Sequence, residues 1–166
     1  MRAVEILEKI KEARGANEKK SILESHSDNT LLLQILRAGL DPFIPFHVVK
    51  VPKVNERNEE TNELIVWNLF FKAVDACATR TITGNEAIAV LHRVFQVAPE
   101  KDEMWMRKVL KKHLAIGASI KTVNKVFPGL ITTFDVSLAQ KFEEKRIESE
   151  VSVYIEPKLD GIRCFA

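Results

Sequence analysis

The chain has 166 residues, of which 46% are hydrophobic, and its 25 Lys and Arg against 23 Asp and Glu give a net charge of +2. A chain of this length buries roughly 70% of the surface that its unfolded form exposes, so it is not a disordered tail and needs no disulfide or metal to hold its core. The two cysteines, Cys77 and Cys164, belong to no Cys/His cluster, which excludes a typical zinc site and favours reduced thiols.

Neither a membrane span nor a secretory signal is predicted. No run of 18 apolar residues occurs, and charged residues follow Met1 at once. The sequence therefore predicts a cytoplasmic protein.

Helical periodicity predicts three short helices in the first 40 residues. The first begins near Val4 and stops at Gly15, a glycine typical of a helix C-terminus. The second starts near an Asn17 cap, and the third runs from near Asp28 to Gly39. These helices are short enough to need packing against one another.

Residues 41–52 contain three prolines and are predicted to be an extended connector. Residues 63–79 are apolar nearly all round, which indicates the central helix of a bundle. Thr83 and Glu86 fit a capping box that starts the next helix. Trp67 and Trp105 are expected in the core or at its rim.

A longer helix is predicted from Pro99 to Ile116, with an apolar face opposite a basic one. The break that follows is Gly117-Ala118-Ser119, where Ser119 can cap a short helix over 120–127. The four histidines are scattered, so no metal site is predicted.

The positive charge is concentrated in this part of the chain. Residues 104–134 carry six basic and no acidic side chains, whereas the remainder carries 19 basic and 23 acidic ones. Such a local excess is typical of a surface that binds phosphates, although a solvated helix face is the simpler alternative. The break at 117–119 adds free backbone N–H groups at the start of a helix, which can also bind a phosphate. The candidate phosphate-binding residues are therefore Lys111, Lys112, Gly117, Ala118, Ser119, Lys121 and Lys125.

The pattern changes after residue 140. A highly charged stretch, 141–150, is predicted to be a linker, and Val151, Val153 and Ile155 alternate with polar residues as in a strand. The predicted organisation is a helical domain over 1–140, a linker over 141–150, and the start of a second domain over 151–166. The string Lys-Leu-Asp-Gly-Ile-Arg at 158–163 follows the strand. Its simplest interpretation is an Asp-Gly hairpin turn flanked by a surface lysine and arginine, and the alternative is a catalytic motif.

This string resembles motif I of the covalent nucleotidyltransferases, which include DNA ligases, RNA ligases and mRNA capping enzymes. The resemblance implies that Lys158 attacks the α-phosphorus of a nucleotide, which requires the amine to lose its proton. It further implies that Glu156 and Arg163 contact the nucleotide, while Asp160 and Gly161 shape the turn. An RNA ligase or capping enzyme fits less well, because motif I of those enzymes is expected much nearer the N-terminus. In this chain a long helical region precedes it.

Two further stretches, 78–88 and 117–131, resemble ATP-dependent DNA ligases of the T-even phage type, in which a helical DNA-binding domain precedes the catalytic domain. The resemblance implies an all-α helical bundle followed by a short β segment that begins a truncated nucleotidyltransferase domain. It implies ATP, Mg²⁺ and nicked double-stranded DNA as cofactors and partners, a monomer, and work in DNA replication, repair and recombination in the cytoplasm of a host cell.

Only eight residues follow Lys158, so the chain alone is expected neither to form an ATP pocket nor to seal a nick. Two functions follow. The chain is the N-terminal part of a DNA ligase that carries the lysine to be adenylated, or it is a stand-alone, sequence-independent DNA-binding module without catalytic activity.

Overall fold

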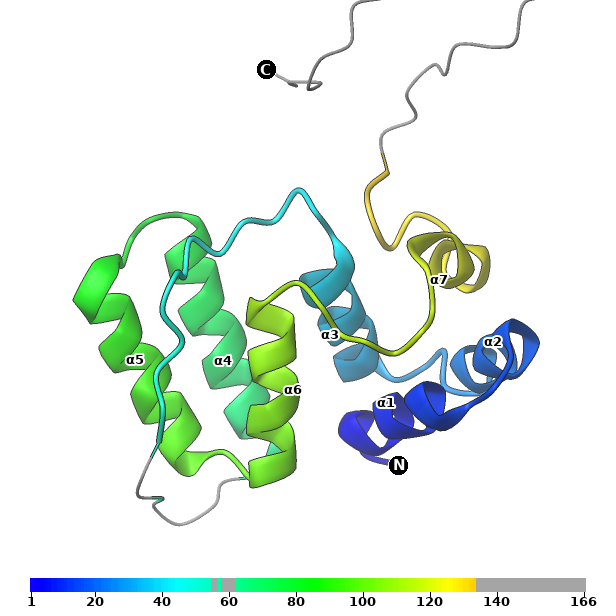
Figure 1. Ribbon diagram of the computed structural model, residues 1–166, viewed down its shortest axis with the longest axis horizontal. Helices are drawn as coiled ribbons and strands as arrows, with labels where there is room; N and C mark the ends of the chain where they lie inside the picture. Colours follow the sequence, from blue (N-terminus) through cyan, green and yellow to red (C-terminus); the bar gives the residue numbers. More distant parts are fainter. Residues whose placement is uncertain (55–56, 58–61, 134–166) are drawn as a thin grey trace, which may run out of the picture. The chain divides into compact units, whose positions relative to one another are not determined.

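The computed structural model of the protein describes residues 1–54, 57 and 62–133, and these are helical with extended or turning connections (Figure 1). They lie within one compact unit, Met1–Thr133. The predicted all-α class is confirmed for this part of the chain, whereas the predicted linker and β segment lie outside the described residues. None of the helices described is long and apolar enough to cross a membrane.

The described part contains seven helices. Their bounds are α1 Ala3–Glu12, α2 Ala16–Glu24, α3 Thr30–Leu40, α4 Glu63–Ala78, α5 Gly84–Val97, α6 Glu100–Leu110 and α7 Ile120–Val126. Helices α4, α5 and α6 lie side by side, and α3 packs on α6 and α1 (Figure 1). Helix α1 also packs on α2, which in turn carries α7. The fold therefore consists of a larger group, α4, α5 and α6, and a smaller group, α1, α2 and α7, with α3 packed between them.

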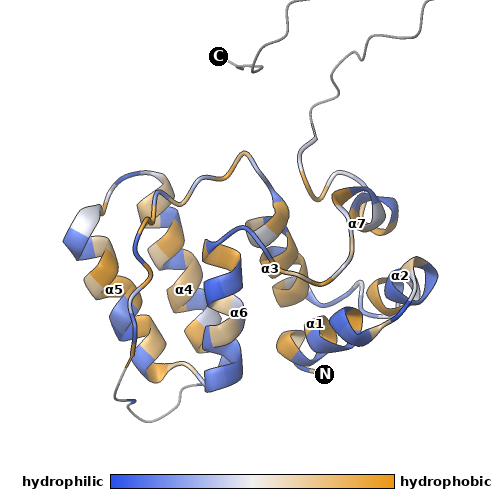
Figure 2. Ribbon diagram, in the orientation of Figure 1, coloured by the Kyte–Doolittle hydropathy of each residue, from blue (hydrophilic) through white to orange (hydrophobic). Residues whose placement is uncertain are grey.

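Large side chains from different helices fill the core. Trp67 and Phe70 of α4, Phe95 of α5 and Trp105 of α6 are fully buried, as predicted for the two tryptophans. Burying a side chain of this size stabilises the fold by about 1.5–3 kcal/mol. The hydropathy of two helices that are consecutive in the chain differs sharply: α3 is largely apolar, whereas α2 is mostly polar (Figure 2).

One helix start differs from that predicted. Gly15 does not end α1 in a left-handed conformation; its φ is −124° and it is the N-cap of α2. The predicted Asn17 cap is therefore wrong by two residues. Helix α3 begins near Asp28, as predicted, and its cap is Asn29, whose side chain accepts a hydrogen bond from Leu32 N.

Gly39 lies inside α3 instead of ending it. A Cβ at this position would lie 2.7 Å from Leu114 Cγ and Cδ2, well inside van der Waals contact. Glycine weakens a helix by roughly 0.5–1 kcal/mol, but overpacking a core costs about 1–3 kcal/mol. Packing against Leu114 thus explains a glycine that local preference alone disfavours.

Later elements also differ in detail. Thr83 is the N-cap of α5, but its side chain makes no capping hydrogen bond, so the predicted capping box is wrong. Helix α6 ends at Leu110, before Ile116, because Lys112 and Ala115 have φ of 53° and 54°, which a right-handed helix does not allow. The short helix α7 and its Ser119 cap are confirmed.

Helix α4 is less enclosed than its sequence indicates. Three of its large apolar side chains are exposed: Leu64, Ile65 and Leu69. The helix packs on α5 and α6 and leaves this face to solvent. The all-round burial expected of a central helix is therefore wrong for one side of α4.

A buried carboxylate joins three helices. Asp102, in the first turn of α6, is inaccessible to solvent and accepts hydrogen bonds from Trp67 Nε1 at 2.8 Å and Arg2 Nη2 at 2.5 Å. Its place near the positive end of a helix also favours a negative charge. Asp102 therefore fixes α4 and the start of α1 against α6.

Replacing this carboxylate tests its contribution. We expect Asp102→Ala to lower the free energy of unfolding by about 2 kcal/mol, because the buried indole N–H loses its acceptor. Asp102→Asn, which keeps an acceptor, should cost less. Urea denaturation followed by tryptophan fluorescence measures both, and equal stability of Asp102→Ala and the natural chain would contradict the assignment.

Candidate nucleic-acid interface

The predicted catalytic and nucleotide-binding residues, and those that shape the turn between them, lie outside the described part of the chain. They are Glu156, Lys158, Asp160, Gly161 and Arg163. Their roles stay predictions. The candidate site that the structure describes is the basic stretch around α6 and α7.

Two cations of this stretch bind inside the protein. The Arg107 guanidinium donates to Glu103 Oε1 at 2.7 Å and to the Pro52 carbonyl at 2.6 Å. The Lys108 ammonium lies 3.7 Å from the centre of the Trp105 ring, a favourable cation–π contact. The basic face of α6 predicted from its sequence is therefore used largely for packing.

Lys112, predicted to face DNA, also has partners inside the protein. Its Nζ donates to Ala38 O at 2.6 Å and to Asp41 O at 3.1 Å, and it lies 4.0 Å from the centre of the Phe46 ring. Burial lowers the pKa of Lys112 to about 8, and the attraction of Asp41 only partly opposes this. Lys112 thus ties the end of α6 to the end of α3.

Three predicted lysines remain exposed: Lys111, Lys121 and Lys125. Within the described ranges, no hydrogen bond or ion pair engages their side chains. Lys121 and Lys125 are four residues apart on α7 and so share one face of that helix. Helix α7, which carries Lys121 and Lys125, packs on α2. Lys111 is followed by Lys112, which binds the end of α3. The exposed lysines are therefore supported by two different helices.

The turn between Ile116 and α7 is held in a defined conformation. Gly117 is exposed with φ of 65°, Ala118 is half-buried, and Ser119 is exposed. The Ser119 hydroxyl accepts from Thr122 N at 3.1 Å and so occupies one N–H group of the helix start. The turn therefore offers small side chains and an open backbone to an approaching phosphate.

The chain after α7 returns to the same unit. The Asn124 side chain donates to Ile131 O at 2.8 Å and accepts from Ile131 N at 3.0 Å. The buried Asp41 carboxylate accepts from Thr132 N at 3.4 Å. These contacts fix the position of α7 relative to the end of the described chain.

The other quoted stretch, 78–88, forms the turn between α4 and the start of α5. Arg80 is exposed and has φ of 58°, while Gly84 has φ of 52°. The Thr79 hydroxyl donates to Asp75 O at 2.9 Å, which anchors the turn to the end of α4. Arg80 is thus an exposed cation outside the basic stretch 104–134.

Sequence reasoning missed one residue beside the candidate site. Lys19 of α2 is 7% exposed, and its Nζ donates to Ile10 O at 2.5 Å and to Ile116 O at 2.9 Å. Nothing in the local pattern distinguishes it from the exposed Lys20 beside it. Lys19 connects α1, α2 and the turn before α7.

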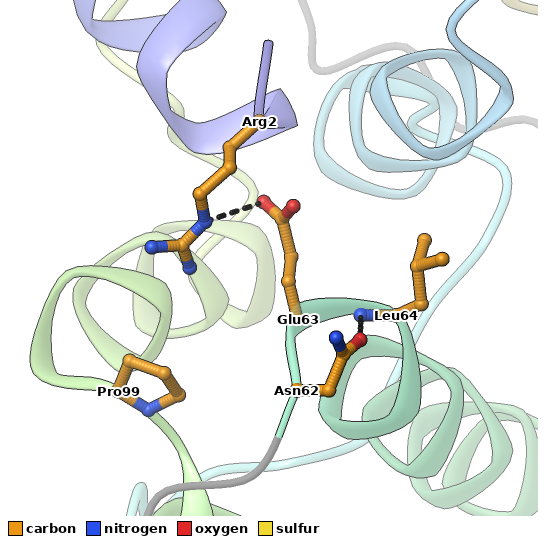
Figure 3. Close-up of a pocket in the computed structure, with 5 residues that line it drawn as sticks. All are labelled: Arg2, Asn62, Glu63, Leu64 and Pro99. Carbon is orange, nitrogen blue, oxygen red and sulfur yellow. Dashed lines mark hydrogen bonds and ion pairs between the residues drawn. The ribbon is translucent and has the colours of Figure 1, made fainter.

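A cavity of about 400 Å³ lies where the start of α1 faces the start of α4 (Figure 3). Arg2 Nε and Glu63 Oε1 approach to 3.5 Å across it, and Asn62 accepts from Leu64 N at 2.9 Å (Figure 3). These charges compensate each other, so the cavity is a poor nucleotide pocket. No cluster of three His, Cys, Asp or Glu side chains suited to a metal occurs in the part that the structure describes.

The pKa of Lys112 gives a test of its internal role. With a pKa of about 8 in the folded chain and an ordinary value of 10.5, the unfolded state binds more protons between these pH values. The free energy of unfolding should therefore rise with pH across this window, relative to Lys112→Met. Urea denaturation at several pH values from 7.5 to 10.5 measures the difference, and a flat difference would show that the ammonium is not desolvated.

The sequence of the chain is similar to those of known DNA ligases. The chain is 31% identical to the DNA ligases of Enterobacteria phages T4 and T6 over 165 residues, which is 98% of this chain and 34% of each ligase. It thus spans about a third of the length of these curated relatives. No family model matches.

Two solved structures, designated Pmar-Lig_PreS3 and Pmar-Lig_Pre., are also similar. Their TM-scores are 0.69 and 0.65 at 25% and 27% identity; they cover 80% and 76% of this chain and 32% and 29% of their own. The resemblance that the motifs indicated is confirmed: along nearly its whole length, the chain is similar to DNA ligases of the T-even phages.

Proposed function

We propose that the chain is the N-terminal part of an ATP-dependent DNA ligase that binds nicked duplex DNA and carries the lysine to be adenylated. The observation that carries the proposal is the similarity to two phage DNA ligases over 98% of the chain. The similarity includes the region of Lys158, because the match covers 98% of the chain and Lys158 lies eight residues before Ala166. A monomer in the host cytoplasm, acting in replication, repair and recombination, is part of the proposal.

The proposed DNA contacts come from the exposed cations and the open turn. Lys111, Lys121 and Lys125 are exposed in the part of the chain that the structure describes and can meet phosphates. Gly117 and Ala118 allow the sugar-phosphate backbone to approach closely. Such contacts fix a protein on the duplex without reading base sequence. This suits a ligase, which must accept nicks of any sequence. Lys112 is left out because its partners are internal.

The proposed chemistry belongs to Lys158. Its neutral amine attacks the α-phosphorus of ATP, so that a phosphorus–nitrogen bond forms and pyrophosphate leaves. Arg163, five residues on, would favour the neutral amine through its positive charge and contact the nucleotide. The AMP then passes from Lys158 to the 5′-phosphate at a nick, which frees the lysine amine. The 3′-hydroxyl attacks this adenylated phosphate, so that the phosphodiester bond forms and AMP leaves. No described residue is proposed as a Mg²⁺ ligand.

The DNA surface is tested by charge reversal. Changing Lys111, Lys121 and Lys125 together to Glu should weaken binding to a nicked duplex at least tenfold at about 0.1 M salt, and should reduce the salt slope by about 3, because each phosphate contact contributes about 0.9. Fluorescence anisotropy over a salt series measures both quantities.

The matched control changes three other exposed lysines, Lys50, Lys72 and Lys101, to Glu and so alters the net charge equally. It should keep most of the affinity. Equal losses in the two variants would show that binding follows overall charge rather than this surface.

The catalytic half is tested by labelling. The chain is incubated with α-labelled ATP and Mg²⁺, with and without the part of the phage T4 ligase that lies beyond the matched region. Label should reach the natural chain only in the complemented mixture, and it should not reach Lys158→Arg. A natural chain that binds DNA but never takes up label would favour the stand-alone DNA-binding module instead.

A further inference from the structure

Lys19 is a buried cation that local sequence does not explain. It lies on the polar helix α2, yet only 7% of its surface is exposed. Burying an ammonium group is unfavourable unless hydrogen bonds replace its water. Ile10 O and Ile116 O supply two such bonds, from residues 9 and 97 positions away. A position that served only to fill the core would be better occupied by an apolar side chain.

The first acceptor explains why a cation is tolerated there. Ile10 lies in the last turn of α1, where carbonyl groups lack partners within the helix and the helix dipole is negative. An ammonium group at this point satisfies a free carbonyl. This contact anchors Lys19 to α1 and leaves the ammonium free to hold a second group.

The second acceptor belongs to the turn beside the proposed DNA surface. Ile116 lies between Ala115 and Gly117, whose φ values are 54° and 65°. The left-handed conformation is unfavourable for alanine and persists only where surrounding contacts impose it. The buried Ile116 side chain supplies one such contact, and Lys19 holds the Ile116 carbonyl at 2.9 Å.

Gly117 lies close to this ammonium. A Cβ at Gly117 would lie 3.2 Å from Lys19 Nζ and 3.4 Å from its Cε, closer than ordinary packing. The glycine thus meets two requirements together, a left-handed backbone and a close approach to Lys19. The exposed face of the same turn is the part that the proposed function assigns to phosphate binding.

We propose that Lys19 is a positioning residue for phosphate binding: its ammonium fixes the backbone of the turn Ile116–Ser119 and, through it, the placement of α7 with Lys121 and Lys125. This inference rests on the proposed DNA binding. Lys19 itself does not reach DNA, because it lies beneath the backbone of the turn.

The experiment compares Lys19→Met with Lys20→Met, which removes the exposed neighbouring lysine and changes the net charge equally. Binding to a nicked duplex is measured by fluorescence anisotropy over a salt series, at a temperature where circular dichroism shows each variant to be folded. Lys19→Met should bind at least tenfold more weakly than the natural chain with an unchanged salt slope, whereas Lys20→Met should lose no more than about twofold.

Gly117→Ala provides a second variant that keeps both lysines and alters only an exposed turn. It should remain folded and bind at least tenfold more weakly, because the added methyl group displaces Lys19 and opposes the left-handed backbone. Because Gly117 also lies on the proposed phosphate-binding surface, faster amide hydrogen exchange in α7 of the DNA-free variant must accompany the loss. If Lys19→Met does not fold, weaker binding by Gly117→Ala without that change in exchange would overturn the positioning role.

The outcomes separate the two proposals. A natural chain without affinity for the duplex would overturn the proposed function. Tight binding by the natural chain together with natural affinity in folded Lys19→Met, or in Gly117→Ala, would overturn the positioning role alone. A salt slope reduced by about 0.9 in Lys19→Met would show that Lys19 contacts a phosphate directly, which also contradicts positioning.

Discussion

The ammonium of Lys19 is shared between the end of α1 and the chain that leads to α7, and the arrangement of the smaller helical group depends on it. The carboxylate of Asp102 performs the corresponding task in the larger group, where it joins α1 and α4 to α6. In both cases a buried charge lies at a helix end whose dipole favours it. The fold therefore uses charge to link helices as well as apolar burial to pack them.

The basic stretch serves two purposes that a charge count cannot separate. Arg107, Lys108 and Lys112 hold the connector, an aromatic ring and the end of α3, whereas Lys111, Lys121 and Lys125 remain exposed. Internal cations keep the loops around α6 in place, and external ones are available to a ligand. Three of the six basic side chains, rather than all of them, are therefore exposed to a ligand.

Local pattern predicted the helices well and their ends less well. The order of the helices, the extended connector and the Ser119 cap follow from periodicity, proline and capping preferences, because these depend on neighbours in sequence. Gly39 and Lys19 do not, since their partners, Leu114 and Ile116, lie far away in the chain. Likewise, the end of α6 at Leu110 reflects the left-handed Lys112, which tertiary contacts impose. The resemblance to DNA ligases was visible in short motifs, whereas the division of the lysines between core and surface required the contacts.

The paired hydrogen bonds between Asn124 and Ile131 also bear on where the protein can be divided. A fragment that stops at Gly129 would leave the Asn124 amide without its partner and remove the buried Ile131 side chain from the core. One that continues past Thr132 retains these bonds and the contact with Asp41. A fragment that keeps these contacts must therefore extend at least to Thr132, beyond the end of α7 at Val126, and a junction with another protein is best placed after that residue.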